Sequence, residues 1–149
     1  MDSDPIESAR PEITCLIAND NEPVLDALGA LLRVEGIEVV GLARTGVEAL
    51  RLLSQRPASV IVLDQRLPDL NGLDVARRAA EIIRKRTAII IYTGYADRAT
   101  VSEALDAGAR GVVLKDATPE NLLHAMSVVS AGQIYLDPRL RLGRREDNR

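Results

Sequence analysis

Polar side chains that could do chemistry follow four short apolar runs of this chain. In order along the sequence, they are Asn19 and Asp20, then Asp64, then Thr93 and finally Lys115. A short run of this kind is typical of a strand buried on both faces of a parallel sheet. The carboxyl ends of such strands meet at one edge of the sheet, where open α/β folds place their ligand sites. We therefore expect these side chains to surround one crevice.

The chemistry that suits this set is phosphoryl transfer. Two neighbouring carboxylates, Asp20 and Asp64, repel each other, and a hard divalent cation such as Mg²⁺ relieves the repulsion. Mg²⁺ usually also takes oxygens from a phosphate, whose remaining oxygens could be held by the Lys115 ammonium and the Thr93 hydroxyl. A carboxylate can itself form an aspartyl-phosphate, and the central Asp64 is the expected acceptor. Taken singly, each residue could equally be a helix cap, a turn residue or a solvated strand end, so the prediction depends on the whole set.

Five apolar runs alternate with five segments of helical pattern. The predicted strands are Ile13–Ala18, Ile37–Ala43, Val60–Leu63, Ala88–Tyr92 and Val112–Leu114. The predicted helices are Glu22–Glu35, a segment capped by Thr45 and ending near Arg56, Leu73–Lys85, Arg98–Ala107 after a cap at Asp97, and a segment from Pro119 to Gly132 after a cap at Thr118. This alternation predicts an α/β, flavodoxin-like three-layer sandwich, with a five-stranded parallel sheet in the order 2-1-3-4-5 and five helices.

Composition and charge limit the class of protein. A length of 149 residues favours one domain, and the chain is 46% hydrophobic and 28% charged, as expected of a globular protein. The net charge of -3 gives no case for nucleic-acid binding, and the single cysteine excludes an internal disulfide. No apolar run approaches the roughly 20 residues of a membrane span, and the first ten residues do not resemble a signal peptide. We therefore expect a cytoplasmic protein without membrane association.

Four stretches of the chain match a known pattern, namely Leu16–Asp20, Val62–Gly72, Ile91–Gly94 and Gly108–Asp116. Together they resemble a response-regulator receiver domain, which is CheY-like in fold, over about residues 13–132. Lys115–Glu120 and Tyr135–Leu140 further resemble the NarL/LuxR-type branch, in which a helix-turn-helix DNA-binding domain usually follows the receiver. The expected organisation is a flexible N-terminal tail over residues 1–12, the receiver over 13–132, and a C-terminal tail or truncated linker over 133–149.

The resemblance implies a role for each residue of the set. Asp64 would accept a phosphoryl group from a sensor histidine kinase, Lys115 would pair with a phosphoryl oxygen, and Thr93 would supply the switch hydroxyl. Phosphorylation and dephosphorylation would be self-catalysed, so the chain would not be an enzyme of the usual kind. The output would be a contact with a downstream protein or an attached effector domain, including a transcriptional one, and a homodimer is one way to form it.

The resemblance also implies a Mg²⁺ site made by Asp20, Asp64 and the backbone carbonyl of Arg66. Asn19 stands where the family usually has an acidic residue, so it would hold the metal only through a water. Since Asn19 lacks the charge, we expect weaker Mg²⁺ binding than in a receiver with both acids.

Four positions would regulate the site. The resemblance implies that Gly94 leaves room for the phosphate and that Arg66 and Tyr95 occupy positions that tune dephosphorylation. Val112 stands where the family usually has an inward-turning Tyr or Phe. Valine has no such swing, so signalling would use the loop after Thr93, with Tyr95, or be reduced.

Two alternatives compete with this interpretation. A degenerate receiver would act as an interaction module that is never phosphorylated, which Asn19 and Val112 favour and the retained reactive set opposes. A hydrolase of the same topology usually needs a second acid two residues after the nucleophile, where this chain has Arg66. No segment after Gly132 has a helix-turn-helix pattern, so we expect no nucleic-acid binding by this chain, whether it is a stand-alone receiver or part of a longer regulator.

Overall fold

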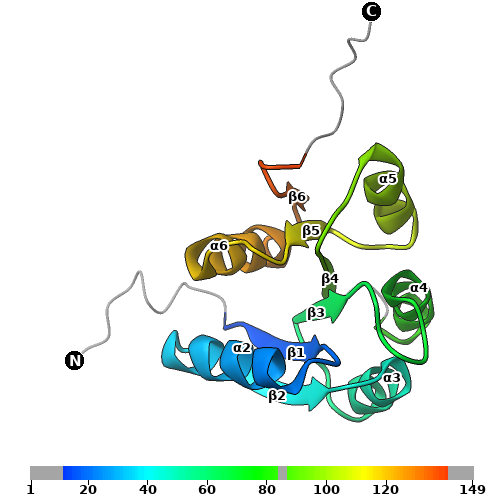
Figure 1. The fold of residues 1–149 in the computed structure, drawn as a ribbon. Coiled ribbons are helices and arrows are strands. Elements are labelled where there is room, and N and C mark those ends of the chain that lie inside the picture. Colours follow the sequence, from blue (N-terminus) through cyan, green and yellow to red (C-terminus); the bar gives the residue numbers. More distant parts are fainter. Residues whose placement is uncertain (1–11, 84–86, 141–149) are drawn as a thin grey trace, which may run out of the picture.

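Strands and helices alternate along the whole described part of the chain. The structure, a computed structural model, describes residues 12–83 and 87–140 (Figure 1). Its strands are β1 (Thr14–Ala18), β2 (Glu38–Ala43), β3 (Val60–Asp64), β4 (Ala88–Thr93), β5 (Gly111–Leu114) and β6 (Tyr135–Leu136). Its helices are α2 (Glu22–Val34), α3 (Gly46–Gln55), α4 (Gly72–Ile83), α5 (Arg98–Asp106) and α6 (Pro119–Ser130).

The strands form one parallel sheet in the order β2-β1-β3-β4-β5-β6. The predicted order 2-1-3-4-5 is confirmed, but the prediction of five strands omitted β6. This strand adds to the outer edge of β5, with Gly111 opposite Tyr135 and Val112 opposite Leu136. Two residues are too few to show a strand period, which is why the sequence placed this segment in a C-terminal tail.

The side chains of the sheet divide the core between its two faces. Ile61 and Leu63 of β3 pack into a cluster with α3, α4 and α5, whereas Val60 and Val62 pack into a cluster with α2 and α6. Figure 1 shows the helices on these two sides of the sheet. All five residues of β3 are buried, as the apolar run predicts for a central parallel strand.

Side-chain caps fix where the helices begin. The predicted caps Thr45, Asp97 and Thr118 each accept a hydrogen bond from the backbone N–H three residues later, at 2.9–3.1 Å. Gly36 and Gly132, with φ of 86° and 88°, follow α2 and α6 in the left-handed conformation that ends many helices. The predicted end of the third helix, at Lys85, lies outside the described residues.

The segment after β6 is held by a buried carboxylate. Asp137 is 2% exposed, and it accepts hydrogen bonds from the backbone N–H groups of Leu114 and Arg139, each at 3.0 Å. The Arg139 guanidinium donates to both oxygens of Asp137, at 3.1 and 3.0 Å, and also pairs with Asp116 at 2.9 Å. We call Asp116, Asp137 and Arg139 the C-terminal clasp.

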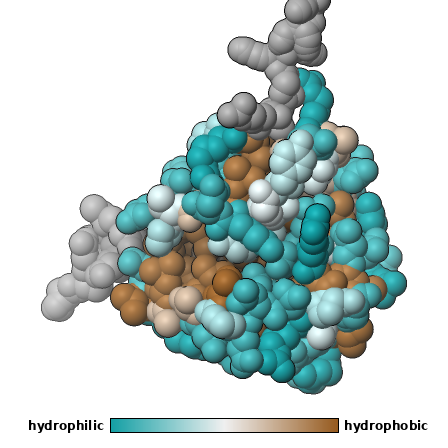
Figure 2. Space-filling view, in the orientation of Figure 1, coloured by the Kyte–Doolittle hydropathy of each residue, from teal (hydrophilic) through white to brown (hydrophobic). Residues whose placement is uncertain are grey.

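The face in Figure 2 is hydrophilic over most of its area, and its hydrophobic residues lie in a few separate areas. The large hydrophobic side chains that are exposed come from different elements and loops, namely Val34, Val47, Ile82, Tyr95 and Ile134. Among the described helices, none combines the length and the apolar character that a membrane crossing requires.

Candidate functional site

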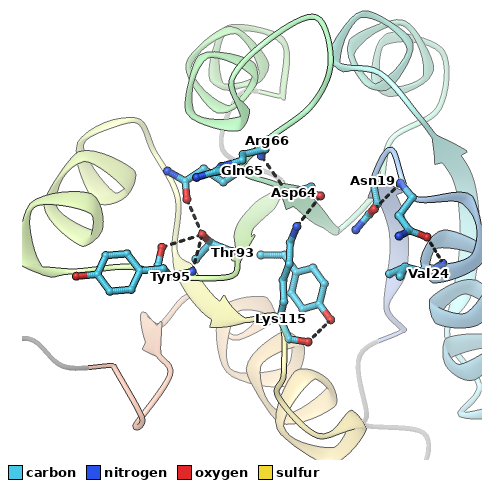
Figure 3. Close-up of polar contacts among 10 residues, drawn as sticks. Asn19, Val24, Asp64, Gln65, Arg66, Thr93, Tyr95 and Lys115 are labelled. Atoms are coloured by element: carbon cyan, nitrogen blue, oxygen red, sulfur yellow. Dashed lines mark hydrogen bonds and ion pairs between the residues drawn. The ribbon is translucent and has the colours of Figure 1, made fainter.

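Three of the predicted reactive residues meet at the carboxyl edge of the sheet. Asp64 ends β3, Thr93 ends β4, and Lys115 directly follows β5 (Figure 3). They open onto a cleft of about 390 Å³, lined by Asp64, Gln65, Arg66, Thr93, Gly94, Tyr95, Thr100 and Lys115. The parallel arrangement of the three strands thus brings residues about 50 positions apart in the sequence into one site.

Asp64 is a buried carboxylate with a partner on each oxygen. The residue is 2% exposed, the backbone N–H of Arg66 donates to its Oδ1 at 2.9 Å, and the Lys115 ammonium donates to its Oδ2 at 3.0 Å. An ammonium at this distance compensates the buried charge and makes a charge-assisted hydrogen bond. The Lys115 side chain is 40% exposed, so its ammonium lies between the carboxylate and the open cleft.

The backbone of Lys115 is fixed by its neighbours in β4. Its N–H donates to the Thr93 carbonyl at 2.8 Å, and the Tyr92 hydroxyl donates to its carbonyl at 3.1 Å. Burial, with the charges of Asp64 and Asp116 as smaller causes, raises the pKa of Tyr92 above its ordinary value. Tyr92 therefore stays a phenol at neutral pH and keeps its proton for this hydrogen bond.

The Thr93 hydroxyl makes hydrogen bonds with residues on the far side of the cleft from Lys115. Its Oγ1 lies 2.5 Å from Oε1 of Gln65 and 2.9 Å from the carbonyl of Tyr95, and the Tyr95 N–H donates to it at 3.3 Å (Figure 3). Gln65 could not be predicted as a site residue, because a polar residue in a loop gives no sequence signal of what it contacts 28 positions away. Its only signal is its place directly after Asp64.

The loop between β3 and α4 is held at several points. The N–H of Gln65 donates to the Tyr92 carbonyl at 3.1 Å, and the Gln65 carbonyl accepts from Gly72 N–H at 2.7 Å. A Cβ at position 72 would collide with the backbone of Asp64 and Gln65, so glycine permits this close return of the chain. Asp69 caps α3 from the same loop, and hydrogen bonds from Gly46 and Val47 lower its pKa.

Asn19 and Asp20, the two residues that follow β1, lie beside the cleft and do not line it. Asn19 is 2% exposed, and its Oδ1 accepts a hydrogen bond from Asn21 N–H at 2.9 Å. Asp20 is exposed. Since β1 and β3 are paired, with Ala18 opposite Leu63, both residues follow a strand adjacent to the one that carries Asp64.

The donor set fits Mg²⁺ better than a metal that needs a full protein cage. Among residues 12–83 and 87–140, no three His, Cys, Asp or Glu side chains gather as a metal site would require. Mg²⁺ is commonly bound by one or two carboxylates, with water completing the shell, and the two carboxylates available here lie at the ends of the adjacent strands β1 and β3, the exposed Asp20 and the buried Asp64.

The predicted regulatory residues fall in two places. Gly94 and Tyr95 line the cleft, and a Cβ at position 94 would meet no atom within 4 Å, so the space beside Gly94 is open. Tyr95 is 72% exposed, and Arg66 is exposed as well. Val112 is fully buried in β5 and belongs to the core cluster of α3, α4 and α5, away from the cleft lining.

Comparison with known proteins identifies the family. Residues 15–127 match the family described as response regulator receiver domain. The chain is 36% identical over 125 residues to the transcriptional regulatory protein DesR of Bacillus subtilis (strain 168), a match that covers 83% of this chain and 61% of DesR. The chain thus spans less than two thirds of the length of this curated relative.

Solved structures agree with the sequence match. A LuxR-family two-component response regulator from Aurantimonas sp. SI85-9A1 superposes with a TM-score of 0.80 at 27% identity, covering 86% of this chain and 91% of that one. A response regulator from Burkholderia pseudomallei, solved with a phosphorylated aspartic acid, a calcium ion and citrate, gives a TM-score of 0.73 at 27% identity over 81% and 70% of the two chains. This chain, with its CheY-like fold, belongs to the response regulator receiver family of two-component systems.

Proposed function

We propose that this chain is a phosphorylation-controlled receiver whose acceptor is Asp64. A sensor histidine kinase supplies the phosphoryl group, and the phosphorylated form changes its contact with a downstream protein or an attached effector domain. The observation that supports this proposal is the pairing of a buried carboxylate with an ammonium at 3.0 Å, at the rim of a cleft that also holds a threonine hydroxyl.

Each residue of the site has its own role in the phosphoryl transfer. A carboxylate oxygen of Asp64 attacks phosphorus, a P–O bond forms, and the P–N bond to the kinase histidine breaks. Lys115 is placed to balance charge on the phosphoryl oxygens, and the Thr93 hydroxyl can donate to one of them. The Arg66 N–H, which donates to Oδ1 of Asp64, would orient the carboxylate for this attack.

Mg²⁺ would be held by Asp20, Asp64 and the carbonyl of Arg66, with Asn19 acting through a water. When bound, it would neutralise the negative charge shared by the carboxylates and the phosphoryl group. The Burkholderia pseudomallei relative was solved with a phosphorylated aspartic acid and a calcium ion, which are the kind of modification and the kind of cation proposed here.

The output of this chain is proposed from its relatives. DesR is a transcriptional regulatory protein, and this chain spans 61% of its length. We therefore propose a cytoplasmic receiver that controls a transcriptional effector or another protein, with homodimer formation as one route. The chain itself would not bind nucleic acid, since its formal net charge is -3.

A phosphorylation-independent interaction module is the second candidate. Asn19 removes one of the usual acidic residues, and Val112 is a buried valine at the position of the usual aromatic switch. These two residues would weaken metal binding and remove the inward swing, while leaving the fold intact.

The intact mass of the protein after incubation with acetyl phosphate and Mg²⁺ distinguishes the two candidates. We expect wild type to gain one phosphoryl group and Asp64→Asn to gain none, because the amide cannot act as acceptor. Asp26→Asn, which changes an exposed aspartate of α2, is the matched control and should behave as wild type. Absence of the added mass in wild type, even at high Mg²⁺, would favour the interaction module.

A further inference from the structure

We propose that Gln65 is a positioning residue that restrains the Thr93 hydroxyl until phosphoryl transfer. This inference rests on the proposed function of Asp64. The geometry that carries it is the contact between Gln65 Oε1 and Thr93 Oγ1, which joins the loop after β3 to the end of β4 across the cleft.

The Thr93 hydroxyl has one proton to donate. Both of the oxygens near it, Oε1 of Gln65 at 2.5 Å and the carbonyl of Tyr95 at 2.9 Å, are acceptors. A phosphoryl oxygen is also an acceptor and needs the same proton. Thr93 can therefore bond the phosphoryl group only after it gives up these two acceptors, and Gln65 competes directly with the phosphorylated state.

Two hydrogen bonds fix the backbone of Gln65, which carries the side chain that contacts Thr93. Its N–H is held by the Tyr92 carbonyl and its own carbonyl by Gly72 N–H, at 3.1 and 2.7 Å. The backbone thus cannot follow the hydroxyl as Thr93 turns. The hydrogen bond between Thr93 Oγ1 and Gln65 Oε1 must therefore break. Its loss removes a contact between the loop after β3 and the loop that carries the exposed Tyr95.

The competition predicts a gain of function when the acceptor is removed. Methionine has nearly the length and volume of glutamine but lacks the amide oxygen. Since a net hydrogen bond is worth a factor of roughly three to ten in an equilibrium, Gln65→Met should raise the steady-state ratio of phosphorylated to unphosphorylated protein by about that factor and should also raise the phosphorylation rate. A residue that merely supports the fold would lower both when it is replaced.

The test measures phosphorylation by acetyl phosphate and Mg²⁺, from intact mass over time, in four proteins: wild type, Gln65→Met, Thr93→Ala and the double variant. We expect Gln65→Met to be faster than wild type, and the double variant to match Thr93→Ala, because no hydroxyl is left to restrain. Two further proteins, Thr93→Ser and Thr93→Ser with Gln65→Met, keep a hydroxyl, and of these the one with Gln65→Met should again be faster. Melting temperatures identify any variant that fails to fold.

The outcomes separate this inference from the proposed function. If wild type is phosphorylated and Gln65→Met reacts at the same or a lower rate, Gln65 does not restrain Thr93, while Asp64 remains the acceptor. An equal gain from Gln65→Met with and without the Thr93 hydroxyl would also overturn the inference. If wild type takes up no phosphoryl group, the proposed function fails, and the inference fails with it.

Discussion

Asn19 is the residue that most clearly sets this site apart from a receiver with two adjacent acids. Its Oδ1 accepts a hydrogen bond from Asn21 N–H, an interaction that an aspartate oxygen could also make. Asn19→Asp should therefore add a negative charge near the proposed metal without disturbing the loop. A charge pair about 4 Å apart in water is worth about 1 kcal/mol, which is a lower limit for a residue that is 2% exposed, so the Mg²⁺ affinity should rise at least roughly fivefold.

Isothermal titration calorimetry with Mg²⁺ measures this effect. Asn21→Asp is the matched control, because it adds the same charge at an exposed helix cap and preserves capping of α2. We expect a smaller gain from it. Equal affinities in wild type and Asn19→Asp would show that Asn19 does not face the metal.

The sequence predicts some site residues and cannot predict others. Asp64, Thr93 and Lys115 are predictable, because each ends a recognisable apolar run and parallel strands bring such ends together. Gln65 and Asp137 are not, because their roles come from contacts with residues more than 20 positions away and neither lies in a periodic pattern.

At the scale of elements, the C-terminal clasp fastens β6 to β5. Burial alone would raise the pKa of Asp137, but hydrogen bonds from Arg139 and from Leu114 N–H outweigh burial and hold it below its ordinary value. Because the pKa in the folded state lies below the unfolded value of about 3.9, this stabilisation is complete above that pH. It is lost as the pH falls through the folded-state pKa.

Asp137→Ala should lower the free energy of unfolding by about 1–3 kcal/mol at pH 7, since it removes the hydrogen bonds that a buried carboxylate accepts from Leu114 and Arg139. The difference from wild type should shrink near pH 3. Urea unfolding at both pH values measures it. Asp116→Ala removes an 80% exposed partner of Arg139 and should change stability little. A loss in Asp137→Ala that does not depend on pH would contradict the assigned charge.

The helices were predictable as elements because their ends carry chemical signals. Thr45, Asp97 and Thr118 cap in the structure as they were predicted to cap, and Gly36 and Gly132 end the helices before them. β6 has no such signal. It exists because β5 offers an open edge and Asp137 a buried anchor, both of which are tertiary features.

At the scale of the whole molecule, the doubly wound order was predictable because alternating strands and helices with right-handed crossovers leave few arrangements. What β6 contributes to the whole can be tested by shortening the chain. Residues 1–134 should melt on the order of 5–10 °C lower than wild type, since Leu136 and Leu140 no longer pack on the core.

Residues 1–140 retain β6 and the clasp and should melt as wild type does. Size-exclusion chromatography should also show self-association of the shorter chain, because its β5 edge would present unpaired backbone groups. Equal melting temperatures and elution volumes for the two shortened chains would mean that β6 contributes nothing to the fold.

The direction of β6 decides on which rim of the sheet the described part of the chain ends. α6 ends on the amino side of the strands, but β6 runs parallel to β5 and returns the chain to the carboxyl side. Arg139, next to this end, pairs with Asp116, the neighbour of Lys115. A reporter domain or dye joined at residue 140 would therefore lie on the same rim of the sheet as Asp64. It would be placed to report a conformational change that begins at Asp64.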